Sequence, residues 1–190
     1  MRCLARCLML LALVPFPAPG GEVLGSSITV DASRYHVSVT ARIDAPPQLV
    51  YETITDYPNL PAVTPSIRSV EVLQMPGPSR HRLRTETVAC ILVFCKRVTL
   101  VQDVEQQAGW RIEAVTLPDM SDFRSGLAQW HLVPSGGGTQ LHFDQTFVPD
   151  FWVPAVIGPW MIERLLLKEV RATTAYIERR HVGDVSNGGE

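Results

Sequence analysis

Residues 150–180 read DFWVPAVIGPWMIERLLLKEVRATTAYIERR, and this stretch decides the fold. From residue 162 onward, apolar side chains recur every three or four positions and most charged side chains fall between them. This period is typical of an amphipathic α-helix. Pro159 suits the first helical turn, where no backbone N–H is needed. We therefore expect one long helix over residues 159–180, packed on a broad apolar surface. The side chains expected to be buried there are Leu166, Val170 and Ile177.

The first 20 residues have the layout of a secretory signal peptide. Arg2 and Arg6 precede an apolar run at residues 8–14, and proline and small residues follow it. The run is too short to span a bilayer, and no cysteine follows it that would carry a lipoprotein anchor. We expect cleavage after residue 20 and secretion to the periplasm. An uncleaved anchor and a poorly ordered N-terminus are the alternatives.

Length and composition indicate one globular domain. The chain has 190 residues, of which 46% are hydrophobic, and one domain is the default for this length. Without residues 1–20, 15 Lys and Arg stand against 19 Asp and Glu, so the formal net charge falls from −2 to −4. An acidic chain without a basic cluster is not expected to bind nucleic acid. We interpret residues 21–34 as a linker, 35–180 as the domain and 181–190 as a disordered tail.

The middle of the chain is predicted to be mainly antiparallel sheet. Residues 35–43 alternate apolar and polar side chains, which is typical of a strand with one buried face. Two short helices are expected next, because prolines 46 and 47 suit a helix start and Pro58 and Pro65 interrupt the pattern. Further strands are predicted at residues 67–74, 81–92, 96–105, 110–117, 123–133 and 140–148. The fold class is therefore α+β, with a curled antiparallel sheet of six to seven strands wrapped on the long C-terminal helix.

Three stretches resemble the START / polyketide cyclase superfamily, also called SRPBCC, which has the helix-grip fold. They are residues 44–61 (DAPPQLVYETITDYPNLP), the pattern Arg124-Ser125-Gly126 with Trp130 and then Gly138-Thr139, and residues 149–160 (PDFWVPAVIGPW). The chain is most similar to the coenzyme-Q-binding, or cyclase/dehydrase-like, branch, over about residues 35–180. The resemblance implies an apolar cavity between the sheet and the C-terminal helix. It implies no single activity, because members range from lipid carriers to cyclases.

Strand alternation indicates which side chains face that cavity. Most of them are apolar, and a few polar side chains in an apolar enclosure are typical of a small-molecule pocket. The candidate ligand contacts are Thr87, Gln102, Trp110, Arg124, Trp130, Phe143, Gln145, Phe151, Trp152 and Trp160. The aromatic residues among them also fit a packed core, and the polar ones also fit backbone partners. For Arg124 the alternative is an ion pair at the rim with Asp122 or Asp144, because a buried unpaired guanidinium is costly.

No catalytic residue, cofactor or metal site is predicted. A hairpin around residues 135–138 places His131 opposite His142 on the outer face and Trp130 opposite Phe143 on the inner face. The two histidines have no evident third partner for a metal ion, so we interpret them as an exposed pair. Neither a nucleophile motif nor a glycine-rich phosphate loop is found. Cyclases of this superfamily work mainly by shaping the substrate, so a missing motif does not exclude an enzyme.

Residues 147–162 carry more large apolar side chains than one helix start needs to bury. They either cap the end of the sheet or form an apolar rim, at residues 151–161, that gates the cavity and touches a membrane transiently. The first hypothesis is a monomeric, secreted binding protein for a hydrophobic small molecule, such as a lipid or a quinone-like compound. The alternatives are a polyketide cyclase or aromatase, and an interaction module whose cavity is filled by its own side chains.

Cys90 and Cys95 are expected to form a disulfide. Four residues separate them between two strand patterns, and both face outward by alternation, so a hairpin turn places them opposite each other. Such a bridge persists in an oxidising compartment. Two free buried thiols are the alternative.

Overall fold

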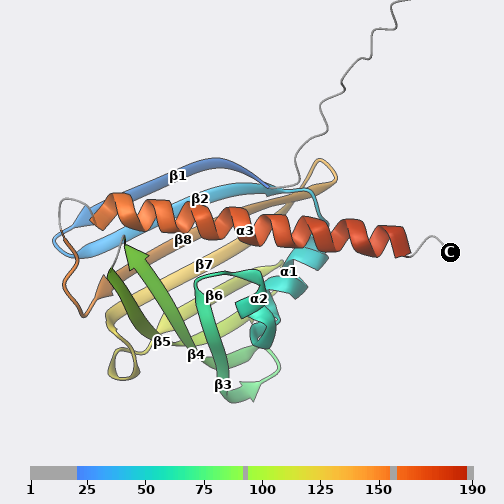
Figure 1. Ribbon diagram of the computed structural model, residues 1–190. Helices are drawn as coiled ribbons and strands as arrows, with labels where there is room; N and C mark the ends of the chain where they lie inside the picture. The colour runs from blue at the N-terminus through green and yellow to red at the C-terminus, as the bar shows by residue number, and fades with distance from the viewer. Residues whose placement is uncertain (1–20, 92–93, 155–157, 188–190) are drawn as a thin grey trace, which may run out of the picture.

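The computed structural model describes residues 21–91, 94–154 and 158–187. Within them, an antiparallel sheet of eight strands curls around a long C-terminal helix, α3 (Figure 1). The strands are β1 (Glu22–Asp31), β2 (Arg34–Ile43), β3 (Ile67–Gly77), β4 (Arg80–Ile91), β5 (Phe94–Gln107), β6 (Arg111–Thr116), β7 (Phe123–Ser135) and β8 (Gly138–Pro149). The helices are α1 (Pro47–Thr55), α2 (Leu60–Val63) and α3 (Gly158–Asn187), with 3₁₀ turns η1 (Tyr57–Asn59) and η2 (Pro118–Met120). The predicted helix-grip fold is confirmed, with the two short helices after β2.

The strand register agrees with the face assignments made from alternation. The order across the sheet is β1-β2-β8-β7-β6-β5-β4-β3, so β2, near the start of the chain, pairs with β8, the last strand. In the β7–β8 hairpin, Trp130 pairs with Phe143 and His131 pairs with His142, as predicted. The two aromatic rings of the first pair are 5.1 Å apart, whereas the imidazoles lie on the opposite face with ring centres 6.3 Å apart.

Residues 21–34 are not a linker, because most of them form β1. This strand pairs along its length with β2 and lies at one edge of the sheet. Only Val23 and Ile28 are half-buried, and the other β1 residues are exposed. An edge strand with one covered face needs few apolar side chains, since its hydrogen bonds to the neighbouring strand supply much of its stability. For this reason its short polar residues give no alternating pattern, and the sheet has eight strands where six to seven were expected.

The C-terminal helix is also longer than predicted. It runs through Asn187 rather than ending at Arg180, so residues 181–187 are helical and not a disordered tail. Val182 and Val185 are 66% and 65% exposed, so this extension packs on little. Once a helix has formed, each added residue gains one backbone hydrogen bond for the one residue that is fixed, which explains how a polar end stays helical. No helix in the described part of the chain is long and apolar enough to cross a membrane.

Helix α3 is fixed to the rest of the protein along both of its sides. Its backbone approaches β1 and β2 on one side and α1 and α2 on the other. Ile177 is fully buried in a core cluster. Leu166 and Val170 are only half-buried, although we expected them to be buried as well. The apolar core is therefore closed beneath the C-terminal half of α3 and less complete beneath its N-terminal half.

The register pairs Cys90 with Cys95 across β4 and β5, as predicted. The side chain of Cys90 lies outside the described ones, so the disulfide stays a prediction. We expect denatured, unreduced protein lacking residues 1–20 to show no reactive thiol, because directly opposed cysteines are close enough to be bridged. The bridge closes a short loop, and its loss should cost less than the ~3 kcal/mol expected for a 15-residue loop.

Thiol titration of that denatured protein, before and after reduction, measures this directly. A Cys90→Ser/Cys95→Ser variant is the control, because it should show no thiol in either condition. Two reactive thiols per chain without reduction would contradict the disulfide.

Candidate ligand-binding site

The candidate site is the concave face of the sheet, which faces α3. Residues that pair directly across neighbouring strands place their side chains on the same face. One such row runs from Val37 through Gln145 and Ala128 to Ala114. Val37, Ala128 and Ala114 are buried, so this row faces the interior and Gln145 points toward α3.

Burial divides the concave face into two parts. Beneath α1 and η1, the inward side chains form a closed core that includes Ala114, Ala128 and Leu132. Nearer the start of α3, Val98, Thr116 and Met161 are buried, but other inward side chains are only half-buried, so solvent reaches part of the apolar surface there. We call this region the open part of the concave face. Its residues are Thr85, Thr87, Leu100, Gln102, Gln145 and Phe147 from the sheet and Ile162, Leu166 and Val170 from α3.

Three of the predicted polar ligand contacts lie in the open part, namely Thr87, Gln102 and Gln145. Among the described residues their side chains have no hydrogen-bond partner, and their polar atoms are not sealed from solvent. An amide or hydroxyl that faces an apolar surface loses stability unless water or a ligand bonds to it. These side chains are therefore available to a bound molecule. Thr116 pairs with Gln102 across β5 and β6, so its side chain lies on the same face. Sequence reasoning did not name it, although Ile112, Ala114 and Thr116 follow one another at every second position of β6.

Arg124 lies at the exposed rim of the sheet and not in the open part of the concave face, and its role as a ligand contact stays a prediction. The β7–β8 register shifts between Phe123 and Ser125, and such an irregularity reverses the face to which the following side chain points. Arg124 is exposed, and its Nε lies 3.8 Å from Oδ1 of Asp150 rather than near Asp122 or Asp144. This is a solvent-exposed ion pair at the rim, a type of contact that contributes little to stability.

Trp110, Trp130 and Phe143 lie against the closed core. Trp110 has a φ of 55° in the turn between β5 and β6, and its side chain packs on the cluster that contains Leu132 and Ile177. Trp130 contacts both core clusters and Phe143. The core interpretation therefore fits these three aromatic residues better than contact with a ligand in the open part.

Aromatic side chains surround the entrance beside the start of α3. The rings of Tyr35 and Phe147 stack with centres 5.2 Å apart. Phe123 contacts both Phe147 and Phe151 edge-on, at 5.7 and 5.8 Å. Sequence reasoning missed Tyr35 and Phe123 as members of this group. Tyr35 reaches Phe147 because β2 pairs with β8, a strand far along the chain, and Phe123 lies beside it because β7 pairs with β8 on the other side.

The two remaining predicted contacts are on the surface at this entrance. Trp152 is 83% exposed and Trp160 is 58% exposed, although large aromatic side chains are usually buried. Cations accompany the aromatic rings, because Lys96 Nζ lies 4.3 Å from the centre of Phe151 and the Arg164 guanidinium lies 5.5 Å from that of Trp160. We call these five residues the aromatic rim.

The titratable groups of the concave face do not form a converging acid–base set among the described residues. Burial raises the pKa of Tyr35 and of Tyr57, while the amide of Gln106, donating to the Tyr57 oxygen at 2.8 Å, opposes that rise for Tyr57. Both phenols therefore stay protonated at neutral pH. His81 contacts Tyr57 edge-on at 5.1 Å, and its buried Nδ1 has no partner among the described residues.

The histidine pair on the outer face behaves as an ordinary surface pair. Partial burial, Arg111 and His142 all lower the pKa of His131. Oγ1 of Thr40 lies 3.4 Å from Nδ1 of His142, which orients that ring. In the described ranges, no three His, Cys, Asp or Glu side chains come together where they could hold a metal ion.

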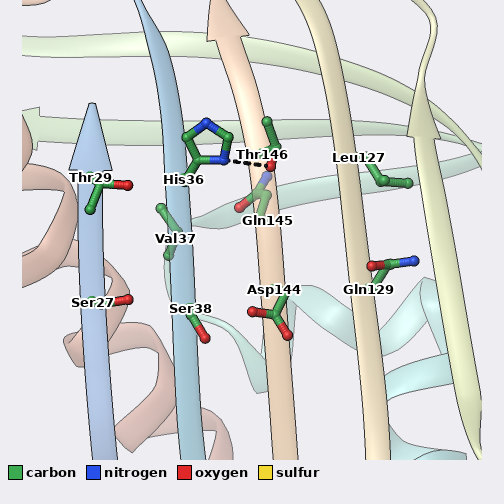
Figure 2. Close-up of a pocket in the computed structure, with 10 residues that line it drawn as sticks. All are labelled: Ser27, Thr29, His36, Val37, Ser38, Leu127, Gln129, Asp144, Gln145 and Thr146. Atoms are coloured by element: carbon green, nitrogen blue, oxygen red, sulfur yellow. Dashed lines mark hydrogen bonds between the residues drawn. The ribbon is translucent and has the colours of Figure 1, made fainter. Parts of the chain in front are cut away.

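A shallow groove of about 150 Å³ lies on the outer face, away from α3 (Figure 2). It is lined mostly by short polar side chains of β1, β2, β7 and β8, and Thr146 Oγ1 lies 3.2 Å from Nδ1 of His36. A second hollow of about 280 Å³, near β4 and β5, contains the paired charges of Arg82 and Asp103. Most of the side chains that line the two hollows are polar or charged, and neither hollow lies in the open part of the concave face.

Comparison with known proteins identifies the family. Residues 34–180 match the family model described as "Polyketide cyclase / dehydrase and lipid transport". The chain belongs to this family. A comparison with curated proteins gives no match.

Solved structures of the same superfamily share the fold at low sequence identity. The aromatase/cyclase Zhui from Streptomyces sp. R1128 is 20% identical, with a TM-score of 0.63 over 77% of this chain and 95% of its own. The protein TTHA0849 from Thermus thermophilus is 22% identical, with a TM-score of 0.60 over 78% and 97%. A STAR-related lipid transfer protein from Xanthomonas axonopodis is 16% identical, with a TM-score of 0.56 over 79% and 98%. At such identities these likenesses show the fold alone.

The floor of the open part depends on a glycine. A Cβ added at Gly126 would overlap Oγ1 of Thr116. We expect Gly126→Ala to lower the free energy of unfolding by about 1–3 kcal/mol, because the overlap forces a shift in a packed row. In the background Thr116→Ala, the same change should cost at least about 0.5 kcal/mol less.

Urea unfolding of the single and double variants measures this coupling. Thr116→Val is the matched control, because it keeps an atom at the crowded position and should leave the cost of Gly126→Ala unchanged. Equal costs in the three backgrounds would contradict the proposed contact.

Proposed function

We propose that this protein binds a hydrophobic small molecule, such as a lipid or a quinone-like compound, in the open part of the concave face. The observation that carries the proposal is the partial burial of apolar side chains that point inward, including Leu100, Phe147 and Leu166. Apolar surface between the sheet and its covering helix is still in contact with water. A bound apolar molecule would remove this surface from water, and that burial favours binding. The same partial burial argues against a cavity filled by the protein's own side chains.

The proposed mechanism is capture and release without covalent chemistry. An apolar ligand is driven into the open part by burial of its surface, and Thr87, Gln102 and Gln145 orient its polar groups. The absence of a converging acid–base set among the described residues favours a carrier over a cyclase. His81, with an unpartnered buried nitrogen, is the observation that favours the enzyme alternative. Turnover of a polyketide-like substrate that is lost in His81→Gln would support that alternative.

The aromatic rim supplies a route between membrane and ligand site in this proposal. Exposed tryptophans and neighbouring cations match the interfacial layer of a bilayer, where indoles and basic side chains are favourable. Rim contact would let an insoluble ligand leave the lipid phase without crossing water. Secretion through the signal-like residues 1–20 would place the carrier in the periplasm, and we propose that it acts there as a monomer.

A neutral fluorescent probe tests the binding function. We expect N-phenyl-1-naphthylamine to bind with an increase in fluorescence, since it is apolar and uncharged. Val170→Trp should lower its affinity at least about tenfold, because an indole placed at this half-buried position occupies the open part. Arg171→Trp on the exposed side of α3 is the matched control and should bind as the parent does.

Native mass spectrometry of protein purified from its own cells completes this test. We expect a non-covalent adduct that is displaced by the probe. A parent protein that carries no adduct and binds no probe would contradict the proposed function.

The rim is tested by membrane binding. We expect Trp152→Ser/Trp160→Ser to weaken association with phosphatidylcholine/phosphatidylglycerol vesicles at least about tenfold, because two indoles no longer enter the interface. Val182→Ser/Val185→Ser removes exposed apolar side chains at the other end of α3 and is the matched control. Vesicle co-sedimentation measures both. If the two double variants bind equally well, the rim is not the membrane contact.

A further inference from the structure

The shallow groove on the outer face of the sheet, which we call the outer groove, is built from two rows of paired side chains (Figure 2). One row crosses four strands as Ser27, Ser38, Asp144 and Gln129, and the next row crosses them as Thr29, His36, Thr146 and Leu127. Such rows are about 7 Å apart along the strands, and four strands span about 14 Å. The hollow of about 150 Å³ is below the ~300 Å³ at which pockets for drug-sized ligands begin, so it fits a ligand of about one ring.

Short side chains on β1 and β2 make this part of the outer face concave. Ser27 and Ser38 reach little beyond the backbone, whereas His36 and Leu127 are longer and come from strands on either side of β8. The imidazole of His36 is held beside Thr146, whose Oγ1 lies 3.2 Å from its Nδ1. The outer groove is therefore bounded by an imidazole ring and an isobutyl group, each of which offers an apolar surface to the C–H groups of a ligand.

Most polar groups of the outer groove are available to a ligand. Among the described residues, the side chains of Ser27, Thr29, Ser38 and Asp144 make no hydrogen bond and no ion pair. The Gln129 side chain donates to Oε2 of Glu113 at 2.9 Å, and its carbonyl oxygen can still accept a hydrogen bond. Hydroxyl groups can donate and accept, while the carbonyl and carboxylate oxygens only accept. This set of groups suits a ligand that carries several hydroxyl groups.

Asp144 places an uncompensated negative charge in the outer groove. Its side chain is exposed, and its cross-strand partners Ser38 and Gln129 are neutral. Its other neighbours on the outer face of β2, β7 and β8 include neither lysine nor arginine. The titratable residues among those neighbours are His36, His131 and His142. Hydrogen bonds to a carboxylate are stronger when the donor is a cation, so a primary ammonium is the donor that this position favours.

We propose that the outer groove binds a hydroxylated ring that carries a primary ammonium, as an amino sugar does. The ammonium donates to Asp144, ring hydroxyls bond to Ser38 and Gln129, and C–H groups of the ring cover Leu127. This site is separate from the open part of the concave face, and it does not depend on the function proposed there. A free amino sugar and one unit of a polysaccharide offer the same chemistry.

Three probes separate the contribution of the ammonium from that of the hydroxyl groups. D-glucosamine carries both, D-glucose carries the hydroxyl groups alone, and cyclohexylammonium carries the charge alone. Backbone amide shifts of the isotope-labelled protein measure both the affinity and the place of binding. We expect D-glucosamine to bind at least about tenfold more tightly than either of the other probes, because it alone makes the charged and the neutral hydrogen bonds together. The largest shifts should fall on groove residues of β2 and β8.

A glucosamine tetramer distinguishes the two sources of the ligand. Tighter binding per sugar unit than for the monomer supports the site with a polysaccharide as its source. Equal binding per unit supports the site with a free sugar as its source.

Variants of the groove locate the binding. Asp144→Asn keeps the shape of the side chain, so D-glucosamine should bind as weakly as D-glucose does and D-glucose should bind as before. Asp119→Asn is the matched control, because it removes an exposed carboxylate of η2 outside the outer groove and should bind D-glucosamine as the parent does. Ser38→Leu and, separately, Ser27→Leu fill the hollow and should weaken both sugars. The dispersion of the amide signals shows that each variant is folded.

Several outcomes overturn the proposal. D-glucosamine that binds no more tightly than cyclohexylammonium shows that the hydroxyl groups are not recognised. Equal binding of D-glucosamine by the parent and by Asp144→Asn shows that the carboxylate does not hold the ammonium. Shifts confined to residues outside the outer groove, or no shifts with any probe, show that the groove is not a site. None of these results bears on the carrier function, which is tested with the neutral apolar probe.

Discussion

The structure depends on how α3 is held above the sheet. Carboxylates of the helix accept backbone N–H groups on both of its sides: Glu169 from Ser66 before β3, and Glu178 from Asp44 after β2. Hydrogen bonds from backbone N–H to a carboxylate are stronger than neutral ones and fix direction as well as distance. Hydrogen bonds on the two sides of α3 therefore hold the helix in place. The space between the helix and the centre of the sheet does not have to be filled with side chains for this contact to form.

This arrangement explains why one protein has both a closed core and an accessible apolar surface. Beneath the second half of α3, side chains from α1 and η1 complete the packing around Ile177 and Tyr57. Beneath the first half there is no corresponding helix in the described part of the chain, so Leu166 and Val170 face the sheet with part of their surface still accessible. The closed core and the proposed ligand site thus lie beneath different halves of the same helix.

Much of the fold could be predicted from the sequence because the period of a strand and the residues of a turn are both local signals. The period of two in residues 140–148, with glycines in the turn before them, was sufficient to pair Trp130 with Phe143. β1 could not be predicted, since Ser26, Ser27 and Thr29 carry no apolar alternation and the strand is stabilised by β2. The place of Arg124 at the rim could not be predicted, because one register shift reverses every face assignment beyond it, and such a shift leaves no mark in the pattern of apolar residues.

The candidate site was partly predictable for the same reason. Gln102 and Gln145 follow from alternation. The aromatic contact of Tyr35 depends instead on the pairing of β2 with β8, two strands far apart in the chain, and that of Phe123 depends on the register shift in β7, and no local pattern encodes either. Family membership does not replace this information, because structures at 16–22% identity share the framework and not the side chains that line it. In the open part, the polar inward residues Thr87, Gln102 and Gln145 are neutral amides and a hydroxyl, and only their own side chains can show which ligand they would suit.

The sheet order sets a constraint on the way the chain assembles. β2 lies between β1 and β8, and residues that meet across β2 and β8, such as Thr40 and His142, are 102 positions apart in the chain. During synthesis the β1–β2 hairpin is made first, yet the inner edge of β2 has no partner until β8 is complete. Closing so long a loop is slow, and an unpaired strand edge promotes aggregation while it persists. The β1–β2 hairpin is thus made first but is among the last elements to gain all its strand pairs. This protein therefore cannot fold progressively from its N-terminus.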